Sequence, residues 1–323
     1  MSAGHVEPLP AGRPPVGSLP PLTVVVPTRG RRELVALAVQ GIVEQDYDGP
    51  ITCLVVHDQE GPDRALEQLG GAGRIVRVLR NDGTVGLAGS RNAGLRHVET
   101  PFVASCDDDD VWLPEKARLQ VQRLLGSPGM MVVGAGIALL LPQGKVVQWL
   151  GPHDVITQQD LLRSRRKELH SSTLLMRTEV FELAGEYDTE LPNSYAEDYE
   201  WLLRAVQHGS IGVVRQPLAR IKKDGVSWFP RERSEVVATA LVHMLERHPE
   251  LRGSRRGHAR VLGQIAFANA TLGERGEALR WARRALARWP LAPQALLALF
   301  QVITRTDPRT LLKVARLAGR GLS

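Results

Sequence analysis

The first half of the chain alternates between short β-branched runs and segments with apolar residues at helical spacing. Residues 22–27 form such a run, which a proline ends, and the apolar positions of 32–44 then share one helical face. Strands that alternate with helices predict a sheet of parallel strands flanked by helices, an α/β fold. Further strands are predicted over 51–56, 75–79 and 102–106, with helices over 63–69 and 90–98.

Three of the predicted strands have chemically useful residues at their carboxyl ends. Ligands of open α/β sheets bind beyond these ends, so we expect the three sets to meet at one crevice. They are Pro27 and Thr28 after the first strand, His57 and Asp58 after the second, and Asp107 to Asp110 after the fourth.

A glycine-rich turn over 81–89 separates the third strand from the helix that follows it. Ser90 is predicted to cap this helix, whose N-terminus can then face an anion. The turn is not a Rossmann fingerprint, because it follows the third strand and lacks the GxGxxG spacing.

After Ser234 the pattern is helical almost without interruption, and residues 272–290 resemble one tetratricopeptide repeat. A repeat of this kind needs a neighbour to bury its apolar face. We therefore predict a flexible, proline-rich arm over 1–20, an α/β domain over 21–232 and a basic helical region over 233–323.

The net charge of +6 is unevenly distributed. Residues 252–323 contain fourteen Lys and Arg against three Asp and Glu, a net +11, which leaves −5 for residues 1–251. A helix over 307–323 would place Arg309, Lys313, Arg316 and Arg320 on one side, facing anionic lipid headgroups or a polyanionic acceptor. The alternative is a helix that caps the repeat-like region. No nucleic-acid motif accompanies the charge, so nucleic acid is not an expected partner.

Location is predicted from two further features. No apolar run approaches the roughly 20 residues that span a bilayer. Cys53 and Cys106 both lie in apolar runs typical of buried strands, where thiols are inert. We expect a soluble protein in the reducing cytoplasm, with peripheral contact at the inner face of the membrane through the basic C-terminus.

The run Asp107 to Asp110 concentrates negative charge after a buried strand. Four adjacent carboxylates repel one another, so a divalent cation is the natural counter-charge. Carboxylate oxygens suit Mg²⁺ or Mn²⁺, which share their remaining sites with water and substrate phosphates, and this predicts a diphosphate ligand. The alternative is a solvated turn and helix start before Pro114.

A second acidic cluster, Glu197 to Glu200, opens an amphipathic helical pattern. Its carboxylates can simply compensate the helix dipole. Near a metal site, one of them can instead remove a proton from an attacking hydroxyl.

Together these motifs resemble those of the family 2 glycosyltransferases of GT-A fold, over about residues 22–229. That resemblance implies a mixed α/β sheet flanked by helices and a nucleotide-sugar donor. The motifs are Val24 to Arg31, Val55 to Asp58, Gly89 to Gly94, Asp107 to Pro114 and the pair Glu197 and Asp198.

The resemblance also implies roles for individual residues. Asp198, which follows a Gly-Glu-Tyr-Asp segment, corresponds to the catalytic base, with Glu197 as second choice, and Asp109 to the direct metal ligand, with Asp107 beside it. Register within the aspartate run is open by one position. The donor-binding residues by motif are Pro27, Thr28, Arg29, Asp58, Arg91, Asp107 and Asp108, the last near the ribose.

Two departures from the family pattern are His57 in place of an aspartate and Ala184 in place of a glycine. Lys222 or Lys223 can reach a donor diphosphate or form a solvated turn. His170, predicted to open a strand, can face the acceptor or be structural.

The expected reaction is a metal-dependent (Mn²⁺ or Mg²⁺), inverting transfer to an acceptor hydroxyl. UDP-sugars are the default donor, and a carbohydrate or lipid-linked acceptor fits polysaccharide, glycolipid or glycoconjugate synthesis. One alternative is a non-catalytic GT-A scaffold that works through its helical tail. Another is a sugar nucleotidyltransferase, which the missing glycine-rich, lysine-containing signature near the first strand disfavours.

Overall fold

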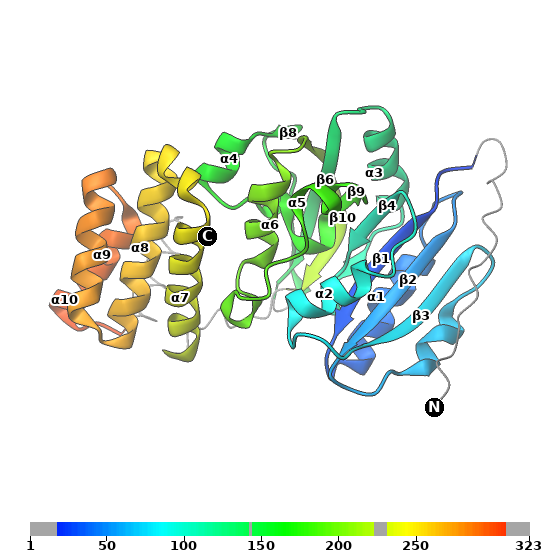
Figure 1. Cartoon of the computed structure of the whole chain (residues 1–323), viewed down its shortest axis with the longest axis horizontal. Helices are drawn as coiled ribbons and strands as arrows, with labels where there is room; N and C mark the ends of the chain where they lie inside the picture. The colour runs from blue at the N-terminus through cyan, green and yellow to red at the C-terminus, as the bar shows by residue number, and fades with distance from the viewer. Residues whose placement is uncertain (1–17, 142–143, 223–230, 308–323) are drawn as a thin grey trace.

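The computed structural model describes residues 18–141, 144–222 and 231–307, and shows a mixed sheet joined to a bundle of helices (Figure 1). The sheet has the order β3-β2-β1-β4-β9-β6-β10-β5, with β7 beside β6 and β8 beside β10. Its strands are β1 (Leu22–Thr28), β2 (Ile51–Asp58), β3 (Arg74–Asn81), β4 (Phe102–Ser105), β5 (Val111–Trp112), β6 (Met130–Leu140), β7 (Val146–Trp149), β8 (Val155–Ile156), β9 (Leu175–Arg177) and β10 (Ser210–Lys222).

The first four strands are parallel, as their alternation with helices predicted. β9 then runs antiparallel to both β4 and β6, so the sheet as a whole is mixed. Leu22, Val24 and Val26 of β1 join one core cluster and Val25 joins the other, because successive side chains of a strand point to opposite faces.

Helices cover both faces of the sheet. The helices of this α/β part are α1 (Arg32–Val43), α2 (Leu87–Leu95), α3 (Lys116–Leu125), α4 (Gln158–Arg163), α5 (Val180–Ala184) and α6 (Glu197–Ala205), with 3₁₀ turns η1 (Arg64–Leu69), η3 (Lys167–Leu169), η4 (Ser171–Thr173) and η5 (Pro192–Ser194). Residues of α1 and α3 belong to one cluster, and residues of α2, α5 and α6 to the other.

Two local predictions were wrong. Helix α2 starts at Leu87, so Ser90 is buried inside it and does not cap it. The N-cap is Gly86, whose φ of 108° favours glycine and whose N–H donates to both carboxylate oxygens of Asp58, at 3.2 and 3.1 Å. The strand expected from His170 begins only at Leu175, because residues 171–173 form a 3₁₀ turn.

The C-terminal part is helical, as predicted, and consists of α7 (Arg231–Arg247), η6 (Pro249–Gly253), α8 (Arg255–Leu272), α9 (Arg275–Arg288) and α10 (Pro293–Thr304). Figure 1 places α9 and α10 at the opposite end of the molecule from β3. Within the described ranges, no helix combines the length and hydropathy that crossing a bilayer needs. The predicted helix over 307–323 lies outside the described residues except for Asp307.

The predicted arm over 1–20 is described only from Ser18. Leu19 packs against the core cluster of α1, and the Pro20 carbonyl accepts a hydrogen bond from the hydroxyl of Tyr47. These last residues of the arm therefore contact the α/β domain.

Ion pairs tie α6 to the helical region. Glu200 is fully buried, and its carboxylate accepts from Arg204 and from Nε2 of His248 at 2.9 Å. Burial raises the pKa of Glu200, but the bonds from His248 and Arg204 outweigh it and bring that pKa to about 2. Asp188 makes a second link, 2.8 Å from Nε2 of His243. The helix that carries Glu197 and Asp198, and the segment before it, are therefore both tied to the helical region.

A fully buried lysine, Lys116, begins α3. Nζ of Lys116 donates to Oε1 of Gln120 at 2.6 Å and lies 3.9 Å from the ring centroid of Trp112. No carboxylate oxygen of the described residues lies within 4.0 Å of this ammonium. Burial accordingly lowers the pKa of Lys116 to about 7.

Lys116→Met is expected to flatten the pH dependence of stability in mildly alkaline solution. The unfolded lysine binds a proton up to its ordinary pKa of 10.5, whereas the folded one releases it near 7. Folding therefore releases a proton between these values, and stability rises with pH by up to about 1.4 kcal/mol per pH unit. Urea unfolding at neutral and alkaline pH should show this rise in wild type and in the exposed control Lys145→Met. An equal rise in Lys116→Met would contradict the assignment.

Candidate active site

A cleft of about 500 Å³ opens at the carboxyl ends of β1, β2 and β4. The three residue sets predicted to converge do so here. It is lined by Pro27, Thr28, Arg29, Arg31, Asp58, Gly86, Leu87, Ser90, Asp107, Asp108 and Asp109. All of the predicted donor-binding residues are among them except Arg91, which is buried behind the cleft.

The aspartate run is a largely buried turn between β4 and β5. Asp108 and Asp110 are only 6% and 2% exposed, so the alternative of a solvated turn is wrong for both. Asp108 accepts from Oγ1 of Thr28 at 2.7 Å and from Nη1 of Arg31 at 3.0 Å. The same Nη1 donates to Asp109 at 2.8 Å. Part of the counter-charge is therefore Arg31, which sequence reasoning did not single out although it lies in the first motif.

Arg91 connects the two acidic clusters. Its guanidinium is 1% exposed, donates to Oδ1 of Asp107 at 2.6 Å and pairs with Glu197. Burial raises the pKa of Asp107, but the nearby charges of Arg91 and His170 outweigh this effect, so the pKa lies below its ordinary value. Burial outweighs Arg91 at Glu197 and raises the pKa of that carboxyl to about 7. Residues far apart in the sequence thus form one charged network.

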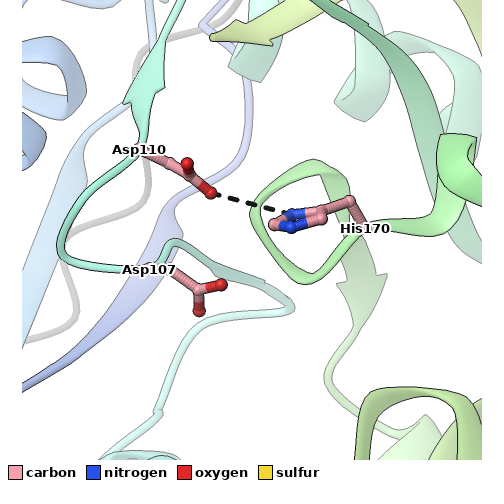
Figure 2. Close-up of side chains that lie close together, drawn as sticks. All are labelled: Asp107, Asp110 and His170. Atoms are coloured by element: carbon pink, nitrogen blue, oxygen red, sulfur yellow. Dashed lines mark ion pairs between the residues drawn. The ribbon is translucent and has the colours of Figure 1, made fainter. Parts of the chain in front are cut away.

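Asp107, Asp110 and His170 face a common space, and their potential ligand atoms all lie within 4.8 Å of one another (Figure 2). Nδ1 of His170 is 3.7 Å from Oδ2 of Asp110. Burial and the charge of Asp107 raise the pKa of Asp110 to about 8. Two carboxylates and an imidazole at these distances can hold a divalent cation.

This grouping differs from the predicted ligand pair of Asp107 and Asp109. Asp107 lies in the group, whereas Asp109 points to Arg31. The sequence left the register of the metal ligands within the run open by one position, and Asp110 lies one position after Asp109. Its partner His170 lies some 60 positions along the chain, where the only sequence signal was a histidine before two serines.

Two serines that the sequence analysis did not single out orient the run. Oγ of Ser171 donates to Asp107 at 2.6 Å, and Oγ of Ser172 donates to Asp110 at 2.5 Å. The backbone N–H of Lys222 donates to the other oxygen of Asp110 at 3.3 Å. The predicted contact of Lys222 or Lys223 with a donor diphosphate would use a side chain, whereas this contact uses the Lys222 backbone. Lys223 lies outside the described residues.

Asp58 uses its carboxylate mainly to hold the glycine-rich turn. Besides Gly86, Nδ2 of Asn81 donates to it at 3.0 Å. Arg29 lies 3.6 Å away, and its side chain is 66% exposed. Arg29 is thus free to reach a ligand, whereas Asp58 shapes the wall of the cleft.

Asp198 lies beside Glu197 but does not line the cleft. Nη2 of Arg165 donates to its Oδ1 at 2.9 Å, and the N–H of Tyr199 donates to the same oxygen at 2.7 Å. Ala196, just before α6, has a left-handed φ of 65°, which fixes the direction in which the helix starts. Arg165 had no recognisable signal in the sequence.

Comparison with known proteins agrees with this geometry. Residues 23–140 match the family described as Glycosyl transferase family 2. This stretch of the chain is similar to the family 2 glycosyltransferases. An uncharacterized glycosyltransferase of Haemophilus influenzae is 26% identical over 192 residues, which cover 58% of this chain and 63% of the relative. The Escherichia coli protein WfgD, named as a UDP-Glc:alpha-D-GlcNAc-diphosphoundecaprenol beta-1,3-glucosyltransferase, is 23% identical over 32% of this chain and 41% of its own length.

Solved structures confirm the GT-A architecture. S. aureus TarS (residues 1–349) in complex with UDP-GlcNAc has a TM-score of 0.57 at 16% identity, covering 87% of this chain and 88% of that one. The mannosyltransferase PcManGT of Pyrobaculum calidifontis, in complex with GDP-Man and Mn²⁺, has a TM-score of 0.55 at 18% identity, covering 92% and 84%. At these identities the likeness concerns the fold.

Proposed function

We propose that this protein transfers a sugar from a nucleotide-diphosphate donor to an acceptor hydroxyl in a metal-dependent, inverting reaction. The observation that carries the proposal is the cleft at the strand ends, where Asp107 connects the group of potential metal ligands with the Arg91–Glu197 pair. A scaffold would have no need to keep this network of buried charges.

The residues present fit a divalent cation. Asp107, Asp110 and His170 offer two carboxylate oxygens and one imidazole nitrogen. Carboxylates suit both Mg²⁺ and Mn²⁺, whereas a nitrogen ligand favours Mn²⁺. A bound cation supplies positive charge where the leaving diphosphate becomes more negative.

The chain's own residues supply the remaining functions. Arg29 and Arg31 bring guanidinium groups to the cleft, where they can bind donor phosphates. Asp198, oriented by Arg165, takes the proton of the acceptor hydroxyl. The acceptor oxygen forms a bond to the anomeric carbon while the bond between that carbon and the donor's phosphate oxygen breaks. The nucleoside diphosphate therefore leaves, and the anomeric configuration inverts. Glu197 is the second candidate for the base.

Donor and acceptor are proposed by class. The names of WfgD and of the TarS complex both contain UDP, which supports a UDP-sugar donor. The diphosphoundecaprenol in the name of WfgD supports a lipid-linked or carbohydrate acceptor. A lipid-linked acceptor would be met at the inner face of a membrane, which fits a cytoplasmic protein that works at that surface.

Calorimetric titration of the protein with UDP tests the proposal. We expect binding to strengthen when Mn²⁺ is present and Asp107→Asn to weaken that binding at least tenfold, because loss of even an indirect metal contact costs about 10- to 100-fold. Asp82→Asn is the matched control, since Asp82 is 72% exposed and lies outside the cleft. UDP affinity that ignores both Mn²⁺ and Asp107→Asn would contradict the proposal.

A further inference from the structure

The outward face of α9 carries arginines that lack matching carboxylates. The helix contains five arginines and one acidic residue, Glu277. Arg280 pairs with Glu277. No carboxylate oxygen of the described residues lies within 4.0 Å of the guanidinium nitrogens of Arg283 or Arg284. Arg284 instead lies 4.3 Å from the ring centroid of Trp281. Positive charge therefore accumulates on this face.

The positive surface continues onto the neighbouring turn and helix. Nη2 of Arg288 donates to the Arg252 carbonyl at 2.6 Å, and Nε of Arg255 donates to the Arg288 carbonyl at 3.4 Å. Burial lowers the pKa of His258 beneath them, and Arg288, Arg252 and Arg284 lower it further. The positive charge of these arginines thus acts on the largely buried ring of His258, and no nearby carboxylate cancels it among the causes of the pKa shift. We call Arg252, Arg255, Arg280, Arg283, Arg284 and Arg288 the basic face.

Apolar side chains lie among these guanidinium groups. A shallow hollow of about 460 Å³ on α9 is lined by Arg280, Arg283 and Arg284 together with Leu279 and Ala287. Leu279 is 44% exposed, and Leu291, in the turn after α9, is 69% exposed. Exposed leucines beside arginines are typical of helices that lie in a membrane interface. A nucleic-acid backbone would satisfy the arginines and leave the leucines in water.

We propose that the basic face docks the protein on a membrane surface that contains anionic phospholipids. Guanidinium groups bind phosphate through two parallel hydrogen bonds, so Arg283 and Arg284 can each hold a headgroup phosphate while Leu279 enters the interface. Figure 1 places α9 at the end of the molecule remote from β3, so docking leaves the cleft free. Docking does not depend on sugar transfer.

Sedimentation of the full chain with vesicles tests this proposal. We expect binding to vesicles that contain phosphatidylglycerol, weak binding to phosphatidylcholine alone, and loss of binding at high salt. The triple variant R280Q/R283Q/R284Q should bind anionic vesicles on the order of a hundredfold more weakly, since each arginine near such a surface contributes about fivefold.

The matched control is R64Q/R77Q/R80Q, which removes the same charge from η1 and β3 at the other end of the molecule. We expect it to bind within about twofold of wild type. Equal loss in both triple variants would show an effect of net charge and overturn the proposal. So would wild-type protein that binds duplex nucleic acid but ignores anionic vesicles. The salt and lipid dependence of wild type decides the matter even if a variant folds poorly.

Discussion

Asp198→Asn is expected to reduce kcat by about 10²- to 10⁴-fold, the usual contribution of a general base. Asparagine keeps the acceptor oxygen that binds Arg165 and the Tyr199 N–H, so the local structure should persist. The amide cannot take the proton of the acceptor hydroxyl, whereas donor binding depends on other residues. The turnover number should therefore fall while the KM for the donor changes little. A transfer or donor-hydrolysis assay, with the nucleotide sugar that a screen identifies, measures both.

Two comparisons sharpen this test. Asp154→Asn, at a residue that is 70% exposed, should retain wild-type kcat and controls for the substitution itself. Glu197→Gln separates the two candidates for the base. Full turnover in Asp198→Asn together with a collapse in Glu197→Gln would transfer the role to Glu197.

Arg91→Met is expected to lower the free energy of unfolding by about 3–5 kcal/mol, the usual cost of breaking a buried ion pair on one side. The change leaves the buried carboxylate of Glu197 and the partly buried carboxylate of Asp107 without their shared cation. Urea unfolding measures the loss. Arg96→Met is the matched control on the same stretch of chain, because Arg96 and its partner Glu186 are 60% and 44% exposed. Such an exposed pair contributes at most about 1 kcal/mol.

The loss in Arg91→Met should also depend on pH. Burial raises the pKa of Glu197 in the folded protein to about 7, above its ordinary 4.5. The contribution of Glu197 to the free energy of unfolding therefore falls as the pH rises from about 4.5 to 7. Without Arg91 the pKa rises further, and the variant should be penalised more above neutrality than in mild acid. Adding Glu197→Gln should recover part of the loss. An equal loss at both pH values, with no recovery in the double variant, would contradict the proposed role of the pair.

The residues at the strand ends show how much of the site is determined by local sequence. Thr28, Asp58 and Asp107 each follow a buried run, and parallel strands place such residues at the same edge of a sheet. Their convergence could therefore be predicted before any contact was known. The helical structure of the residues after 234 was equally predictable, because the spacing of apolar residues indicates a helix without reference to the rest of the fold.

Capping of α2 shows where that reasoning fails. Ser90 is a good local capping residue, but the helix starts three residues earlier, at Leu87. The carboxylate of Asp58, which lies 28 positions before Gly86, accepts the first N–H and fixes the start of the helix. A partner from another strand carries no signature near the helix it caps.

The aspartate run gives the same contrast in electrostatic terms. Sequence alone indicated an acidic site and its place in the sheet, because both follow from residue type and from the strand before it. Tertiary structure decided that Arg31 and Arg91 supply counter-charge, that Asp107 and Asp110 face His170, and that Glu197 belongs to the same network. Charges interact through distances in space, and those distances are set by segments whose separation along the chain is not fixed by any local pattern.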